Sequence, residues 1–240
     1  MSSRPLYYDD AYRREFAGAV VGSEEQAIFL DQTCFYPRGG GQPGDSGELE
    51  IDGVWRPVAP ARRIKGQIAH IVDGEIPAAG TRLRGRIDWD RRFRLMRLHT
   101  ALHVLSQVVF SEYGAQVTGA NIADDGAKAR MDFALEGMRI AEILGDLEKA
   151  TNDLIGQGAA VKTYELPRAE AFQIPDLIRS HINLLPESIT QVRIVEIVGI
   201  DLQADGGTHV ASTDQIGTVK MIGGANKGRI NRRVEIAVAD

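Results

Sequence analysis

The sequence predicts an α+β protein, in which a small N-terminal β-barrel precedes a domain with helices packed on a mostly antiparallel sheet. Three observations predict this class. Short strand-like stretches follow one another over residues 17–88 with no long helical pattern between them. Helical patterns begin only after this run. Further strands follow the helices without strict βαβ alternation, which favours helices on one face of an antiparallel sheet.

The N-terminal region contains six candidate strands, separated by Gly and Pro residues and by the turns Asp52-Gly53 and Asp73-Gly74. These strands are expected over residues 20–21, 26–31, 47–51, 55–58, 67–72 and 82–88. The character of the chain changes at residues 88–90. We therefore expect a barrel domain over residues 1–89 and a second domain over residues 90–240.

The chain is organised around a helix predicted over residues 91–113, with Asp90 as its expected N-cap. Apolar side chains recur along it in steps of three and four, as in a half-buried helix. His99 and His103 each follow a leucine of this stripe, and their four-residue spacing places both imidazoles at the edge of the buried face. Two imidazoles there can reach one metal ion. The alternative is an ordinary pair of histidines at the core margin.

The second domain contains further elements with clear patterns. Strands are expected over residues 127–133, 161–165, 190–200, 216–222 and 230–238. A helix is expected over residues 138–155 with Gly156 as its stop, and short helices over 167–172 and 175–182.

Asp205 and His209 repeat the four-residue spacing, but Gly206-Gly207 between them favours a tight turn over a helix. Together with His99 and His103 they offer three nitrogens and one oxygen, an acceptable ligand set for Zn²⁺. The alternative is a glycine turn with unrelated polar neighbours.

Two familiar zinc chemistries are disfavoured. Thr100 stands where the helix of an HExxH metalloprotease carries its glutamate base. Cys34 is the only cysteine and lies in the first domain, whereas structural zinc sites usually rely on cysteines. What remains is a metal site tied to a substrate, with the base unidentified.

Two other stretches are unusual. Residues 36–47 are rich in glycine, but they lack the Gly-Lys-Ser/Thr ending of a phosphate loop and no helix follows. They form either an irregular loop or a loop whose bare backbone approaches a ligand or the other domain. Basic residues are crowded between 82 and 97 and again between 226 and 233. Such runs are commonly solvated faces, but two beside one candidate metal site suggest a polyanionic substrate held by its phosphates.

Composition narrows the class of protein. The chain has 240 residues, 43% hydrophobic and 25% charged, and a net charge of −5, which argues against indiscriminate nucleic-acid binding. It has no apolar run of transmembrane length and no visible signal peptide. A single cysteine excludes an internal disulfide and fits a reducing compartment. We expect a cytoplasmic protein with no membrane association.

Four motifs in order resemble a known family: FYPRGGGQPGDSG (35–47), RLMRLHTALH (94–103), DGGTHVASTDQIG (205–217) and NKGRINRR (226–233). They are similar to the free-standing alanyl-tRNA editing proteins of the AlaX type, medium form, which resemble the editing domain of alanyl-tRNA synthetase. The resemblance extends from about residue 17 to 238.

The resemblance implies an enzyme that hydrolyses, without ATP, the ester bond of tRNA(Ala) mischarged with serine and, in some members, glycine. Mischarged tRNA(Ala) is then the partner, and no obligate protein partner is evident. His99, His103 and His209 are implied as zinc ligands. The glycine-rich loop is implied to face the editing site, and basic residues are implied to hold the tRNA acceptor end. The implied substrate-binding residues are Gly39, Gly40, Gly41, Gln42, Arg92, Lys227, Arg229 and Arg232.

One departure matters, because Asp205 stands where the family has cysteine. A carboxylate is a harder and weaker donor to zinc than a thiolate, so weaker binding or another divalent ion is expected. Asp205 either ligates the metal or leaves it to act as a base. The metal either activates water or anchors the α-amino group.

Thr100 and Thr208 are candidate catalytic hydroxyls that orient the water or the serine side chain, unless they only satisfy backbone groups. Two other functions stay open. One is a non-catalytic tRNA-binding module with a degenerate metal site, and the other is a metal-dependent hydrolase of another ester.

Overall fold

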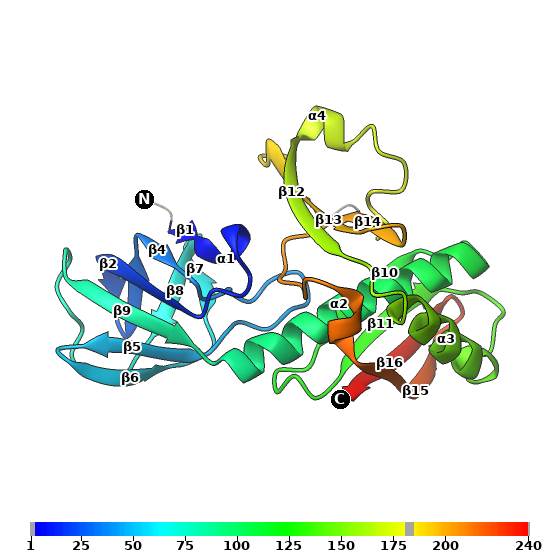
Figure 1. Cartoon of the computed structure of the whole chain (residues 1–240), viewed down its shortest axis with the longest axis horizontal. Helices are drawn as coiled ribbons and strands as arrows, with labels where there is room; N and C mark the ends of the chain where they lie inside the picture. The colour runs from blue at the N-terminus through cyan, green and yellow to red at the C-terminus, as the bar shows by residue number, and fades with distance from the viewer. Residues whose placement is uncertain (1–2, 181–184, 240) are drawn as a thin grey trace. The chain divides into compact units, whose positions relative to one another are not determined.

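The computed structural model describes residues 3–180 and 185–239, in two compact units (Figure 1). Unit 1 comprises Met1–Leu95 and unit 2 comprises Met96–Asp240. Helix α2, Trp89–Tyr113, carries the chain from one unit to the other. The division therefore falls inside this helix, whereas the sequence predicted a boundary ahead of it. Among the described residues, no helix is both long enough and apolar enough to cross a membrane.

Unit 1 consists of short strands and a one-turn helix, ahead of the first turns of α2. Its elements are β1 Arg4–Pro5, α1 Leu6–Asp9, β2 Glu15–Glu24, β3 Ala27–Leu30, β4 Gln32–Thr33, β5 Gly47–Ile51, β6 Val54–Val58, β7 Arg62–Ile64, β8 Gln67–Ile71 and β9 Arg82–Ile87. Seven strands form one antiparallel sheet in the order β6-β5-β9-β2-β3-β8-β7. β1 and β4 form a separate parallel pair.

The closed barrel predicted for this unit is not confirmed, because the sheet is a half-barrel whose edge strands β6 and β7 do not pair within residues 3–95. Strand β2 bends the sheet. Its first half pairs with β9 and its second half with β3, with a bulge between Val20 and Gly22. The predicted strands are present, although β2 is far longer than expected and the short strands β1, β4 and β7 were not expected.

The N-terminus of α2 corrects a second expectation. Asp88, and not Asp90, caps the helix, because Asp88 Oδ1 accepts a hydrogen bond from the Arg91 N–H at 3.0 Å. The helix begins at Trp89, so Asp90 already lies in its first turn, where a carboxylate still interacts favourably with the helix dipole.

His70 is fully buried in unit 1 and is satisfied as a neutral ring. Its Nδ1 lies 3.1 Å from the carbonyl oxygen of Ile28, and its Nε2 lies 2.8 Å from the Thr33 hydroxyl. The Nδ1–H therefore donates to the carbonyl, and the hydroxyl donates to Nε2. Burial lowers the pKa of His70 to about 4.

This buried ring predicts a loss of stability in mild acid. Below about pH 6.5 His70 is protonated in the unfolded chain but stays neutral in the folded one. The free energy of unfolding therefore falls as the pH is lowered, until the pH reaches the folded pKa of about 4. The loss from this group is about 3 kcal/mol at most. Both tryptophans, Trp55 and Trp89, lie in unit 1, so urea unfolding followed by tryptophan fluorescence at pH 7 and pH 4.5 measures it. The variant His70→Gln should show a smaller pH dependence, and an unchanged one would contradict the prediction.

Unit 2 combines the rest of α2 with two antiparallel sheets and a second long helix (Figure 1). Its elements are β10 Val117–Ile122, β11 Ala129–Ala134, α3 Ile140–Ile155, β12 Val161–Pro167, α4 Arg168–Ala171, β13 Gln191–Ile197, β14 Asp201–Ala204, η1 Thr213–Ile216, β15 Thr218–Lys227 and β16 Asn231–Ala239. One sheet has the order β10-β11-β16-β15 and the other β12-β13-β14. The α+β arrangement with mostly antiparallel sheets is confirmed.

Helix α3 covers the outer edge of the larger sheet. The side chains of Asn152 and Glu148 accept hydrogen bonds from the backbone N–H groups of Val219 and Met221 in β15, at 2.9 and 2.7 Å. Gly224 permits a close approach, because a Cβ there would lie 3.0 Å from the Ile140 side chain. The helix thus satisfies polar groups that an uncovered edge strand would expose.

Three predictions in unit 2 need correction. The strand expected over residues 190–200 is two strands, β13 and β14, because the chain turns at Gly199 with a φ of 75°. Residues 175–180 are not helical, and Asp176 has a φ of 56°, which ends any helix there; residues 181–182 of that predicted helix lie outside the described residues. β10 was not expected. The helices expected over residues 138–155 and 167–172 are confirmed as α3 and α4.

Candidate metal centre

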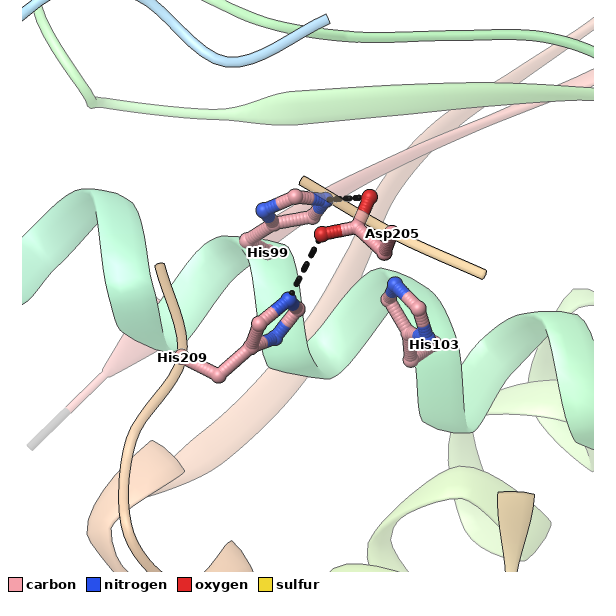
Figure 2. A group of neighbouring side chains, drawn as sticks. All are labelled: His99, His103, Asp205 and His209. Atoms are coloured by element: carbon pink, nitrogen blue, oxygen red, sulfur yellow. Dashed lines mark hydrogen bonds and ion pairs between the residues drawn. The ribbon is translucent and has the colours of Figure 1, made fainter. Parts of the chain in front are cut away.

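Four side chains from distant segments meet in unit 2 (Figure 2). They are His99, His103, Asp205 and His209, and their potential ligand atoms all lie within 4.8 Å of one another. The α2 histidines lie on successive turns, as their spacing predicts. Asp205 and His209 come from the segment after β14. The predicted convergence is therefore present, whereas the role of each residue stays a prediction.

Asp205 links the histidines of the cluster. Its Oδ1 lies 3.5 Å from Nε2 of His99, and its Oδ2 lies 3.0 Å from Nε2 of His209. The ring centroids of His99 and His209 are 4.4 Å apart, and those of His103 and His209 are 4.9 Å apart. Both carboxylate oxygens are thus directed at imidazole nitrogens (Figure 2).

The glycine turn that carries Asp205 is held from both sides. The Gly207 N–H donates to Asp205 Oδ2, which closes a turn between side chain and backbone. Arg193 of β13 donates to the carbonyl oxygens of Asp205 and Gly207 at 3.1 and 2.9 Å. The turn is therefore fixed relative to β13, and Asp205 and His209 are not unrelated polar neighbours.

Thr100 fastens this segment to α2. Its hydroxyl donates to the carbonyl oxygen of Met96 at 2.9 Å and accepts from the Val210 N–H at 3.2 Å. Thr100 Oγ1 also lies 3.2 Å from Nδ1 of His209. Because the hydroxyl hydrogen already serves Met96, Oγ1 is the acceptor and His209 Nδ1 carries the hydrogen. Nε2 of His209 then presents its lone pair to the cluster.

A second carboxylate lies behind His103. Oδ2 of Asp201, in β14, lies 3.0 Å from Nδ1 of His103 and accepts from Gln203 Nε2 at 2.9 Å. The Asp201 side chain is fully buried. Its Oδ1 lies 2.7 Å from Nη1 of Arg179. These two atoms form an ion pair, but their geometry does not satisfy that of a hydrogen bond. Asp201 is thus enclosed by a histidine, an amide and a guanidinium.

Burial governs the protonation of the cluster. Burial lowers the pKa of His99 to about 4, although the charge of Asp205 opposes this shift. Burial also lowers the pKa of His209 well below its ordinary value, and His99 and His103 add to that effect. Burial also opposes ionisation of Asp205, but the histidines outweigh it and hold the pKa of this carboxyl well below its usual range. For His103, burial lowers the pKa, but the hydrogen bond with Asp201 and its charge raise it above the ordinary value.

These residues fit a divalent metal ion. In a tetrahedral site with bonds of about 2.0–2.2 Å, ligand atoms lie about 3.4 Å apart. The distances of Asp205 from His99 and His209 are 3.5 and 3.0 Å, close to that value. Nε2 of His209 and Oδ2 of Asp205 direct lone pairs at each other, and a cation between the two atoms would stabilise this arrangement. Three imidazoles and a carboxylate are also the donor types that zinc accepts.

The glycine-rich loop of unit 1 contains a tight turn. Gly39 and Gln42 exchange backbone hydrogen bonds of 3.1 and 2.9 Å, and the two residues between them, Gly40 and Gly41, have φ values of 56° and 83°. Such a turn requires glycine or a similarly tolerant residue. Gln42 is buried. Residues 39–42 therefore form an ordered turn inside the loop, which excludes neither interpretation of the loop. The role of these four residues in substrate binding stays a prediction.

Two basic residues expected at the substrate are buried structural groups. Arg92 is fully buried and paired with Asp45, and it donates to the carbonyl oxygens of Ala11 and Cys34 at 2.9 and 2.6 Å. Arg232 is buried and donates to the carbonyls of the β15–β16 turn and of Met138. The structure therefore gives both guanidinium groups a structural role, and contact of either residue with the substrate stays a prediction.

Other basic residues stay at the surface. Lys227 is exposed, and Arg229 is exposed beside Glu136 at 3.2 Å. On β9 exposed and buried residues alternate, and the exposed Arg84 and Arg86 pair with Glu50 and Glu48 on β5. These two pairs neutralise part of the basic run expected over residues 82–97.

The sequence missed Asp201, Arg193 and Arg179. Asp201 stands four residues before Asp205, but the strand predicted over residues 190–200 ends just before it. Arg179 falls in a predicted short helix that is absent. No local pattern connects these residues to the histidines, since each contact joins separate elements of unit 2.

The convergence of three imidazoles and a carboxylate marks this α+β chain as a candidate metal-binding protein. Two family models match the chain: tRNA synthetases class II (A) over residues 9–91, and threonyl and alanyl tRNA synthetase second additional domain over residues 192–235.

Curated relatives extend over nearly the whole chain. The alanyl-tRNA editing protein AlaX-M of Methanosarcina barkeri is 41% identical over 98% of this chain and 98% of the relative, and that of Saccharolobus solfataricus is 40% identical over 97% and 98%. The alanine–tRNA ligase of Thermoplasma acidophilum is 37% identical over 92% of this chain but only 25% of the ligase. The chain belongs to the AlaX-M family of alanyl-tRNA editing proteins.

Proposed function

We propose that this chain is a trans-editing aminoacyl-tRNA hydrolase, which removes serine from mischarged tRNA(Ala) at a zinc centre. Glycine is the second amino acid to test. The observation that carries the proposal is the cluster of His99, His103, Asp205 and His209, in a chain whose full-length relatives are named alanyl-tRNA editing proteins. The proposed compartment is the cytoplasm, which the single buried cysteine supports.

In the proposed reaction, water adds to the carbonyl carbon of the aminoacyl ester and the bond from that carbon to the ribose oxygen breaks. Free serine and uncharged tRNA leave. When bound, the divalent ion supplies Lewis-acid chemistry, which acidifies a water molecule or anchors the α-amino group. Because an aminoacyl ester is already reactive, holding it beside a positioned water contributes much of the rate.

The chain's own residues divide into ligands and supports. Both oxygens of Asp205 are directed at histidine nitrogens, which supports a role as ligand rather than base. Thr100 has its hydroxyl engaged by Met96, Val210 and His209, which supports a positioning role rather than contact with water. Thr208 is fully buried next to His209 in the sequence and is retained as the candidate hydroxyl at the substrate.

Metal analysis of purified protein followed by deacylation assays tests the proposal. We expect bound zinc near one ion per chain, hydrolysis of Ser-tRNA(Ala) that chelation abolishes, and a preference over Ala-tRNA(Ala) of roughly 10²-fold or more. Binding of tRNA without turnover would identify a non-catalytic module instead. Hydrolysis of small esters but not of charged tRNA would identify a different metallohydrolase.

Changing Asp205 to cysteine tests its role as ligand. A thiolate is a softer donor than a carboxylate, so Asp205→Cys should raise the affinity for Zn²⁺ roughly tenfold or more and widen its preference over Mn²⁺. The matched variant Asp205→Asn keeps the shape and removes the charge, and it should weaken binding of both ions. Competition with a chromogenic chelator measures the affinities. Equal Zn²⁺ affinity in all three proteins would show that Asp205 does not touch the metal.

A further inference from the structure

We propose that Asp201 is a positioning residue of the metal centre, which holds the His103 ring so that Nε2, and not Nδ1, binds the ion. This inference deepens the proposed function and rests on it.

A hydrogen bond joins the side chains of Asp201 and His103. Asp201 Oδ2 lies 3.0 Å from Nδ1 of His103, and both side chains are buried. An ionised carboxylate only accepts hydrogen bonds, so Nδ1 carries the hydrogen and the lone pair of the neutral ring is on Nε2. A carboxylate on the distal nitrogen is the usual partner of a metal-bound histidine, because it fixes the tautomer and the ring orientation.

Both carboxylate oxygens of Asp201 are held by further side chains. Gln203 donates to Oδ2 at 2.9 Å, and Arg179 Nη1 lies 2.7 Å from Oδ1. The guanidinium of Arg179 lies 4.7 Å from the ring centroid of Phe110, about two turns beyond His103 on the same helix. The carboxylate therefore cannot rotate away from His103 without breaking two further contacts.

His209 is held from behind in a similar way. The Thr100 hydroxyl accepts the hydrogen on Nδ1 of His209, so the lone pair of Nε2 is directed at the cluster. Two of the three imidazoles are thus oriented from behind, one by a hydroxyl and one by a buried carboxylate. The carboxylate makes the stronger hydrogen bond, so its loss should have the larger effect on metal binding.

Zinc affinity in the full-length chain tests the proposal. Asp201→Asn should lower the Zn²⁺ affinity about 10- to 100-fold in competition with a chromogenic chelator. The matched control is Asp132→Asn, which breaks the Asp132–Arg233 pair of 2.7 and 2.8 Å in the same unit but involves none of the histidines. The control should bind Zn²⁺ within about twofold of the wild type, since it alters no ligand or ligand support.

A second measurement uses the wild-type chain, so its result does not depend on whether the Asp201→Asn variant folds. Long-range ¹H–¹⁵N spectra of the Zn²⁺-loaded chain should show His103 protonated on Nδ1 and metal-bound through Nε2. Metal on Nδ1, or unchanged affinity in Asp201→Asn, would overturn the inference while leaving the proposed function intact. Absence of Zn²⁺ binding by the wild type would overturn both.

Discussion

Replacing His103 by alanine is expected to lower the rate of Ser-tRNA(Ala) deacylation by roughly three orders of magnitude or more, together with the loss of bound zinc. The cluster would retain His99, Asp205 and His209, and would leave the Asp201 carboxylate facing a cavity in place of the His103 ring. A cation held by two imidazoles and one carboxylate has lost a ligand from a set of four, which weakens both its binding and its Lewis acidity. Single-turnover deacylation and metal analysis of the purified variant measure the two effects.

The matched control lies on the same helix. Ser106 is also buried in α2, and its hydroxyl makes no hydrogen bond within the described part of the chain. Ser106→Ala should therefore keep full zinc content and a deacylation rate within about twofold of the wild type. If His103→Ala retained activity while losing its metal, the metal-dependent mechanism would be wrong. Equal losses in both variants would point to disturbance of the helix.

Replacing Asp45 by asparagine is expected to destabilise unit 1 by about 3–5 kcal/mol. Arg92 and Asp45 are both fully buried, with Arg92 Nε at 2.9 and 3.0 Å from the two carboxylate oxygens. The carboxylate also accepts from the Tyr36 N–H at 2.6 Å. Without it, a guanidinium would stay buried with no countercharge, and a charge in that state costs far more than a surface ion pair contributes. Urea unfolding followed by tryptophan fluorescence measures the change.

A surface ion pair in the same unit serves as the control. Glu50 pairs with Arg84, whose side chain is 68% exposed, so Glu50→Gln should leave the free energy of unfolding almost unchanged. The double variant Asp45→Asn/Arg92→Met should recover part of the stability, because it removes the unpaired buried charge. A loss below about 1 kcal/mol in Asp45→Asn would show that water or rearrangement relieves the guanidinium.

The elements with strong periodicity were predicted well. Apolar residues at helical spacing identified α2 and α3, because a helix that buries one face must repeat its pattern every three to four residues. The strands with several β-branched residues were also found. β10 was missed because its Gly119, Ala120 and Asn121 carry little preference for a strand. The break between β13 and β14 was missed because one glycine with positive φ decides it.

The roles of charged residues were predicted less well. Arg92 looked like a substrate contact because its neighbours are basic, yet its partner Asp45 lies far back in the chain. Arg84 and Arg86 looked like a basic face, yet glutamates on the paired strand neutralise them. Burial and pairing of a charge depend on which strand or loop packs beside it, and the local sequence does not identify that distant segment.

From the sequence alone came the two histidines on one helical face, the motif with Asp205 and His209, and the family resemblance. These depend on residue types and on spacing within one element, which helical geometry converts directly into position. The tertiary structure decided that the two motifs meet, that Asp201 lies behind His103, and that Arg92 is buried. His103 and Asp201 are 98 residues apart, and only the packing of β14 against α2 places one hydrogen bond between them.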